Sequence, residues 1–135
     1  MPDASDNKQL MEHIFAELSS GNSRPFVERL ADDVRWTVMG HTRWSKTYLG
    51  KQTVLTDLLG ELRGHLADRY RATAERLIAE GDHVVVQARG QATTKAGIPY
   101  NNEYCFIYRM ADGKIQEVTE YLDTQLLTTA LGTAP

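Results

Sequence analysis

Ionisable and aromatic side chains are densest between Tyr100 and Asp123, in the segment YNNEYCFIYRMADGKIQEVTEYLD. Asp112-Gly113 divides this segment into two strand-like runs, and both residues tolerate positive φ, so the pattern predicts a β-hairpin. Side chains alternate between the two faces of a strand. If Glu120 faces a pocket, so do Val118 on its own strand and Asn102, Tyr104, Phe106 and Tyr108 on the neighbouring strand. A carboxyl group there could act as a general acid or base, provided that aromatic walls raise its pKa.

Helices precede this hairpin, and a run of strands leads into it. Apolar residues at i, i+1, i+4, i+5 and i+8 predict a first helix that begins at Asp6 and ends at Gly21. Its stripe consists of Leu10, Met11, Ile14, Phe15 and Leu18. The remaining expected elements are a short helix from Ser23, a strand at 34–39, a loop at 40–50, a helix at 51–62, strands at 69–80, 84–94, 100–110 and 114–123, and a last helix at 124–131.

Short turns rich in Gly and Asp separate the later strands, so consecutive strands must pair antiparallel. The strands run to about eleven residues, nearly twice the usual length, and such strands coil strongly. The sequence therefore predicts an α+β fold in which a strongly curved antiparallel sheet wraps around the N-terminal helices. We expect one domain over residues 1–135, with its core at about 7–131, and a cone-shaped cavity suited to a small molecule.

This order of elements, with Gly40, Gly50-Lys51, Asp112–Ile115 and Glu120–Asp123, resembles the SnoaL-like, ketosteroid isomerase-related branch of the nuclear transport factor 2-like superfamily. The resemblance implies a cone-shaped, cystatin-like barrel. The superfamily includes steroid isomerases, polyketide cyclases, an epoxide hydrolase, dehydratases and non-catalytic binding domains, so the fold alone does not fix the activity.

The catalytic positions of the steroid isomerases fall on Phe15, Val38 and Phe106 in this sequence. None of these side chains can transfer or donate a proton, whereas that chemistry needs an Asp base with Tyr and Asp donors. The resemblance therefore argues against steroid isomerase activity.

Similarity to limonene epoxide hydrolase implies a catalytic role for Glu120, paired with Arg89. The second carboxylate of that enzyme falls on Gln91, and its Tyr and Asn fall on Trp36 and Val38, so the epoxide-opening relay is not intact. An Arg beside Glu120 would lower its pKa, which favours a permanently ionised base or an anchor. The alternative is a partly buried ion pair with a structural role only.

The expected pocket is apolar and aromatic-walled, which suits a planar or cyclic apolar ligand. Besides Glu120 and Arg89, its predicted ligand-binding residues are Trp36, Val38, His41, Trp44, Tyr48, Gln91, Asn102, Tyr104, Phe106 and Val118. The loop residues among them, His41, Trp44 and Tyr48, are expected at the mouth. His41 could shuttle protons, but on a Gly-flanked polar loop it is more often a solvated side chain.

Composition excludes several classes of function. The chain has 135 residues, 41% of them apolar, and a net charge of −3 without a basic patch, so we expect no nucleic-acid partner. Cys105 is its one cysteine, and its four histidines are scattered, so we expect no metal site, and no nucleotide motif indicates a cofactor. No apolar run reaches the length of a membrane span. We expect no membrane partner and a cytoplasmic location.

The outer face of the hairpin is expected to carry Cys105, Ile107, Ile115, Thr119 and Tyr121. An apolar face with no helix over it implies a partner surface, so we expect a homodimer through this face. Two hypotheses about function remain. The first is a cofactor-independent acid–base enzyme, of the cyclase, isomerase or hydratase/hydrolase type, on an apolar or polyketide-like substrate. The second is a non-catalytic ligand-binding or dimeric interaction module of the same fold.

Overall fold

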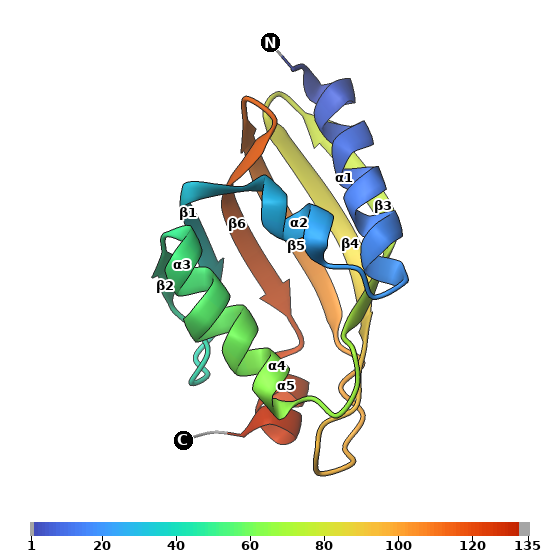
Figure 1. The fold of residues 1–135 in the computed structure, drawn as a ribbon, viewed down its shortest axis with the longest axis vertical. Helices are drawn as coiled ribbons and strands as arrows, with labels where there is room; N and C mark the ends of the chain where they lie inside the picture. Colours follow the sequence, from blue (N-terminus) through green and yellow to red (C-terminus); the bar gives the residue numbers. More distant parts are fainter. Residues whose placement is uncertain (1, 133–135) are drawn as a thin grey trace.

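A computed structural model describes residues 2–132 of the chain, and it confirms the predicted α+β architecture (Figure 1). Met1 and residues 133–135, which the expected domain includes, lie outside the described residues. The elements in order are α1 (Ala4–Ser19), α2 (Arg24–Arg29), β1 (Leu30–Val38), β2 (Thr47–Leu49), α3 (Lys51–Thr53), η1 (Val54–Gly60), α4 (Glu61–His65), β3 (Arg71–Glu80), β4 (His83–Gln91), β5 (Glu103–Ala111), β6 (Lys114–Leu122) and α5 (Thr124–Leu131). No helix among the described residues is long and apolar enough to cross a membrane.

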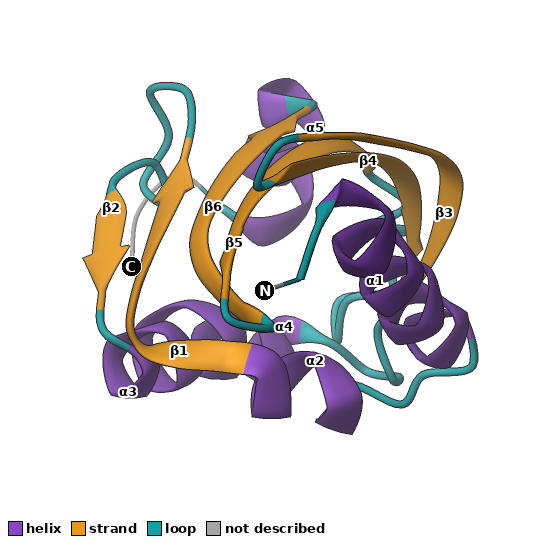
Figure 2. Cartoon of the chain, turned by 90° about the horizontal axis from the view of Figure 1, so that it is seen from above, coloured by secondary structure: helices purple, strands orange, loops and turns teal. Residues whose placement is uncertain are grey.

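The strands form one curved, unclosed sheet in the order β2-β1-β6-β5-β4-β3. Strands β3 to β6 pair antiparallel in succession. Two-residue turns join β3 to β4 and β5 to β6, and residues 92–102 join β4 to β5. Strand β1 runs parallel to β6, because most of the chain lies between these two strands and no tight turn constrains their direction. Figure 2 shows the sheet curling around α1, which lies on its concave side. The predicted cone-like fold is therefore confirmed.

Helix α1 begins earlier than the sequence pattern indicates. Asp3, not Asp6, is its N-cap residue, and the two side chains cap each other's backbone N–H groups at 2.9 and 3.1 Å. The predicted apolar stripe is correct, since Met11, Ile14 and Phe15 are buried against the sheet.

The third predicted helix is present, but its central part, η1, is a π-helix. Gly60 fits this wider turn, because a Cβ there would lie 2.8 Å from the carbonyl oxygen of Leu55. Leu58 and Leu59 of this segment, with Leu62 of α4, face the concave side of the sheet.

A β-bulge changes the faces of β6 near its start. The pairing shifts between Arg109–Glu117 and Met110–Ile115, so Gln116 is the extra residue. Ile115 is consequently fully buried, and its predicted place on the outer face is wrong. Tyr121, beyond the bulge, is 45% exposed on the outer face as expected.

Candidate functional site

A cavity of about 850 Å³ lies between the concave face of the sheet and the helices. Its wall is mostly carbon, supplied by leucine side chains from the helices and by aromatic rings from the strands. Seven residues predicted to face the pocket line it: Trp36, Val38, Trp44, Tyr104, Phe106, Tyr108 and Glu120.

Glu120 is the one carboxyl group of this wall that belongs to the sheet. It is paired across β6 with Val38 of β1 on one side and with Phe106 of β5 on the other, and it is only 9% exposed. The indole Nε1 of Trp36 donates a hydrogen bond of 2.9 Å to its Oε1. Burial raises the pKa of Glu120 from 4.5 to about 7, and the hydrogen bond from Trp36 opposes this rise.

Three aromatic rings stand in a row beside Glu120 on the inner face of β5. Tyr104 stacks on Phe106 at a centroid distance of 4.9 Å, and Phe106 stacks on Tyr108 at 5.6 Å. Alternation along the strand places them two residues apart on one face. The row gives the cavity a flat aromatic wall, as the sequence pattern predicted.

Two further tyrosines, Tyr70 and Tyr100, line the cavity near Tyr104 and were missed in the sequence. They lie just before β3 and β5, although the predicted strands at 69–80 and 100–110 included them. Alternation from Asn102 and Tyr104 would have placed Tyr100 on the inner face. A signal was present in the small residues of the facing strands, because Ala88 and Gly90 point inward and leave room for large rings. A Cβ at Gly90 would lie 2.9 Å from the hydroxyl oxygen of Tyr70 and 3.2 Å from that of Tyr104.

Three residues predicted to bind ligand are buried but do not line the cavity: Tyr48, Asn102 and Val118. The hydroxyl of Tyr48 donates to the backbone carbonyl of Trp44 at 2.9 Å, which secures the loop. The amide of Asn102 holds the start of β5 against Asp123 at the end of β6. The hydrogen bonds of Tyr48 and Asn102 hold the loop and the strand ends in place, outside the cavity wall.

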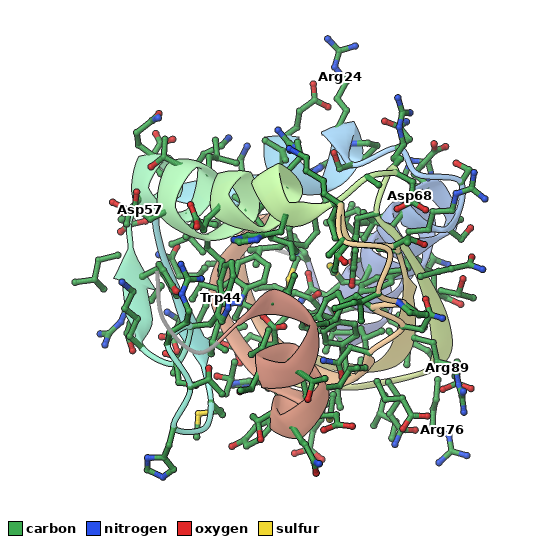
Figure 3. All side chains as sticks on the ribbon, turned by 90° about the horizontal axis from the view of Figure 1, so that it is seen from below. Arg24, Trp44, Asp57, Asp68, Arg76 and Arg89 are labelled. Carbon is green, nitrogen blue, oxygen red and sulfur yellow. The ribbon has the colours of Figure 1, made fainter. Side chains whose placement is uncertain are left out.

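Arg89 and Gln91 face solvent, so their predicted contact with the pocket is wrong. Arg89 bonds Glu75 at 3.0 Å and Glu103 at 3.2 Å on the outer face, and Figure 3 shows it projecting from the edge of the molecule. The reason is register: Arg89 is paired with Glu103, and Ala88 with the inward-facing Tyr104. The inward set of β4 is therefore Val84, Val86, Ala88 and Gly90, and Glu120 has no Arg89 beside it.

The loop between β1 and β2 contributes Trp44 to the site but not His41. His41 is exposed beside a separate shallow depression that it shares with Gly40 and Thr124. Trp44 is 3% exposed and lies inside the molecule in Figure 3, with the guanidinium of Arg43 4.6 Å from its ring centre. Of the loop residues predicted at the mouth, Trp44 alone lines the cavity.

The sequence profile of the SnoaL-like domain matches residues 11–118 of the chain. The chain belongs to the SnoaL-like family. No protein of curated function matches the sequence of this family member significantly.

Solved structures with the same fold as this SnoaL-like chain include proteins described as NTF2-like. An NTF2-like protein from Burkholderia thailandensis E264 is 20% identical, with a TM-score of 0.79 and complete coverage of both chains. A putative SnoaL-like polyketide cyclase from Jannaschia sp. CCS1 is 19% identical, with a TM-score of 0.77 over 100% of this chain and 97% of the other. TerC co-crystallised with polyporic acid is 21% identical, with a TM-score of 0.76 over 93% and 97%. These similarities establish the fold of the chain.

Proposed function

We propose that this protein binds a small apolar molecule, planar or cyclic, in its cavity and performs acid–base chemistry on it without a cofactor. One observation carries the proposal: Glu120 is a buried carboxyl on the cavity wall, and its pKa is about 7. A group with a pKa near the working pH populates both protonation states, so it can remove a proton and return it.

Trp36 fits this role of Glu120 because it fixes one carboxylate oxygen. With Oε1 held by the indole N–H, the other oxygen is the one that can meet a ligand. It would take a proton from a carbon next to a carbonyl group. The electron pair of that C–H bond would form a C=C bond, and the π pair of the carbonyl group would move onto its oxygen. Return of the proton to another atom of the resulting enolate completes an isomerisation. In a cyclisation the enolate carbon attacks a second carbonyl carbon, and the alkoxide that forms takes the proton back from Glu120.

The volume of the cavity and the descriptions of two structurally similar proteins support a polyketide-like substrate. A volume of about 850 Å³ lies in the usual range for small-molecule sites. The relative from Jannaschia is described as a putative polyketide cyclase, and TerC was crystallised with polyporic acid. Polyketide-like ketones are therefore the substrates to try first.

Two other mechanisms have no support in the arrangement of residues. Phe15, Val38 and Phe106 line the cavity and offer only carbon at the points where steroid isomerases hold their catalytic groups. The Arg89–Glu120 pair of the epoxide hydrolase comparison is not formed, because Arg89 bonds outer-face carboxylates.

The test is Glu120→Gln, which keeps an oxygen for the Trp36 hydrogen bond. On any polyketide-like ketone that the wild type converts, we expect turnover to fall by about 10²- to 10⁴-fold, with ligand affinity nearly unchanged. Glu117→Gln is the matched control, because Glu117 bonds Arg109 at 3.0 Å outside the cavity. Wild-type protein that binds such ketones without converting any of them would indicate a non-catalytic binding module instead.

We also propose that the protein is a homodimer through the outer face of β5 and β6. Half-buried Cys105 and Ile107 lie there beside Thr119 and the exposed Tyr121. Ion pairs flank them, Arg109–Glu117 on one side and Arg89–Glu103 on the other. An apolar centre within a charged rim is the usual composition of a protein interface.

A further inference from the structure

The exposed residues of the cavity wall come from neighbouring segments, and they mark where the cavity opens to solvent. They are residues 22–24 and 28 around the start of α2, Arg63 in α4, and residues 67–69 before β3. The first and third segments touch, because the side chain of Arg69 lies against Gly21. All other residues that line the cavity are buried or half-buried. A ligand therefore enters between α2, α4 and the segment before β3, which we call the opening.

Arg63 and Arg69 are cations at this opening that have no protein partner. Among the described residues, neither side chain forms an ion pair or a hydrogen bond; the arginine side chains that do are those of Arg24, Arg29, Arg43, Arg89 and Arg109. The stem of Arg69 packs closely on the chain, since a Cβ on Gly21 would lie 2.5 Å from its Cδ and 3.1 Å from its Cγ. The packed stem presents the guanidinium group at the opening without a counter-charge.

The two carboxylates at the opening each have another partner. Glu28 lies 3.9 Å from Arg24, which Figure 3 shows projecting away from the molecule. Asp68 accepts the backbone N–H of Thr93 at 2.9 Å. Three guanidinium groups thus line the opening beside two carboxylates, although the whole chain has a net charge of −3. The surplus positive charge of the opening belongs to Arg63 and Arg69.

The interior of the cavity has the opposite electrostatic character. Glu120 is the one carboxyl group on the buried part of the wall, and most of the surrounding surface is carbon. An anionic group of a ligand would lose its hydration there, and ionised Glu120 would repel it. At the opening the same group would keep water and meet two guanidinium groups, whose planar donors match a carboxylate. A ligand with one anionic end is therefore favoured in a single orientation, with its apolar part inside.

We propose that the ligand is amphipathic, with an apolar ring system that fills the cavity and a carboxylate that binds Arg63 and Arg69 at the opening. The inference rests on the proposed function, since the ring system carries the ketone on which Glu120 acts. It narrows the substrate class to polyketide-like keto acids. Arg63 and Arg69 are then positioning residues, because their hold on the carboxylate directs the ketone towards Glu120.

Two unreactive fluorescent probes of the same shape test the inference, pyrene-1-carboxylate and pyrene-1-carboxamide. They share one flat ring system, and only the carboxylate is charged. Without cations at the opening, the carbon-lined cavity would favour the neutral carboxamide. We expect the wild type to bind the carboxylate about 3- to 10-fold more tightly at low salt, as two partly exposed ion pairs provide. High salt should reduce this preference, because it screens exposed charges.

Variants show whether the preference comes from these two arginines. Arg63→Met combined with Arg69→Met removes both charges and keeps apolar stems, so the preference for the carboxylate should disappear while carboxamide affinity stays nearly unchanged. Arg63→Lys combined with Arg69→Lys should retain most of the preference, because the charge remains. Arg35→Met combined with Arg76→Met is the matched control, since both arginines are exposed outside the cavity wall and Figure 3 shows Arg76 projecting from the molecule. This control should keep the wild-type preference.

The outcomes separate the inference from the proposed function. Wild-type protein that binds both probes equally, or the carboxamide more tightly, would overturn the inference and leave the proposed function intact. A preference that survives in the folded Arg63→Met, Arg69→Met protein would do the same, as would its equal loss in the control, which would assign it to net charge. Failure of the wild type to bind either probe or any polyketide-like ketone would overturn both. The wild-type preference and its salt dependence need no variant, so the test does not depend on how the variants fold.

Discussion

Glu120 combines two properties that rarely occur together, deep burial and a single hydrogen bond from a neutral donor. A surface carboxylate is held ionised by water, and a buried one is usually held ionised by a cation or by several N–H groups. Within the described residues, the carboxyl of Glu120 has only the indole N–H of Trp36. The free energy of ionising Glu120 is therefore higher in the folded protein than in water. This difference is measurable as a pH-dependent change in the free energy of unfolding.

The pH dependence of folding has a definite sign at this residue. Between pH 4.5 and about 7 the folded protein keeps the Glu120 proton that the unfolded chain has lost, so stability falls as pH rises through this window. In Glu120→Gln the side chain cannot ionise, so this fall in stability does not occur. We expect the two proteins to have similar free energies of unfolding near the lower limit, and the variant to be more stable by up to about 3 kcal/mol above the upper limit. Urea denaturation of both proteins across this range measures the difference, and a constant difference would contradict the raised pKa.

Gly90 is a second residue on which the site depends. An added methyl group would lie 2.9 Å from both the Tyr70 hydroxyl oxygen and a ring carbon of Tyr104, so the phenols must move. Gly90→Ala should cost about 1–3 kcal/mol, as overpacking does, and should weaken ligand binding. Gly64→Ala in α4 is the control, because a Cβ there meets nothing within 4 Å and Ala favours the helix. Thermal unfolding compares the two, and an unchanged midpoint in Gly90→Ala would contradict the packing described.

At the scale of elements, α5 lines part of the cavity, and Asp123 caps its first turn. Asp123 caps the helix by accepting from the N–H groups of Gln125 at 3.0 Å and Leu126 at 3.1 Å, and Leu127 and Leu131 then face the cavity. The curved sheet forms one side of the cavity, and α5 covers another part of it.

Removal of the Asp123 cap should lower both stability and ligand affinity, whereas removal of the Asp3 cap should lower stability alone. Asp123→Ala should cost about 1 kcal/mol and weaken the binding of a polyketide-like ketone several-fold, because α5 loosens over the cavity. Asp3→Ala removes a comparable cap from α1, at the end away from the cavity-lining Phe15 and Leu18, and should cost similar stability with binding unchanged. Chemical denaturation and fluorescence titration provide the two readouts. Equal loss of affinity in both variants would show that general destabilisation, rather than α5, is responsible.

At the scale of the whole molecule, the sheet has two faces with different roles. The concave face holds the cavity, and the convex face over β5 and β6 is the proposed dimer surface. Ile107→Glu places a charge at the centre of that surface and should shift the protein towards monomer in sedimentation velocity. Leu49→Glu is the control, since Leu49 is 61% exposed on β2, at the edge of the sheet. A sedimentation profile unchanged by Ile107→Glu would refute the proposed interface.

The sequence by itself determined the order of the main helices and strands, since helical stripes, strand alternation and turn residues act between near neighbours along the chain. It missed the short strand β2 within the predicted loop at 40–50 and the π-helical turn of η1. The hairpin faces of Tyr104, Phe106 and Glu120 followed from this alternation, together with the turn at Asp112-Gly113. The last helix, Thr124–Leu131, was also predicted at the bounds that the structure shows.

Tertiary structure alone decided which side chains meet. The bulge at Gln116 turned Ile115 inward, and the pairing of Arg89 with Glu103 turned the expected partner of Glu120 outward. Trp36 became that partner although it lies 84 residues away, and Tyr70 and Tyr104 came together over Gly90. Strand register has a period of two residues, so a shift of one residue reverses every face, and only contacts between distant strands fix it.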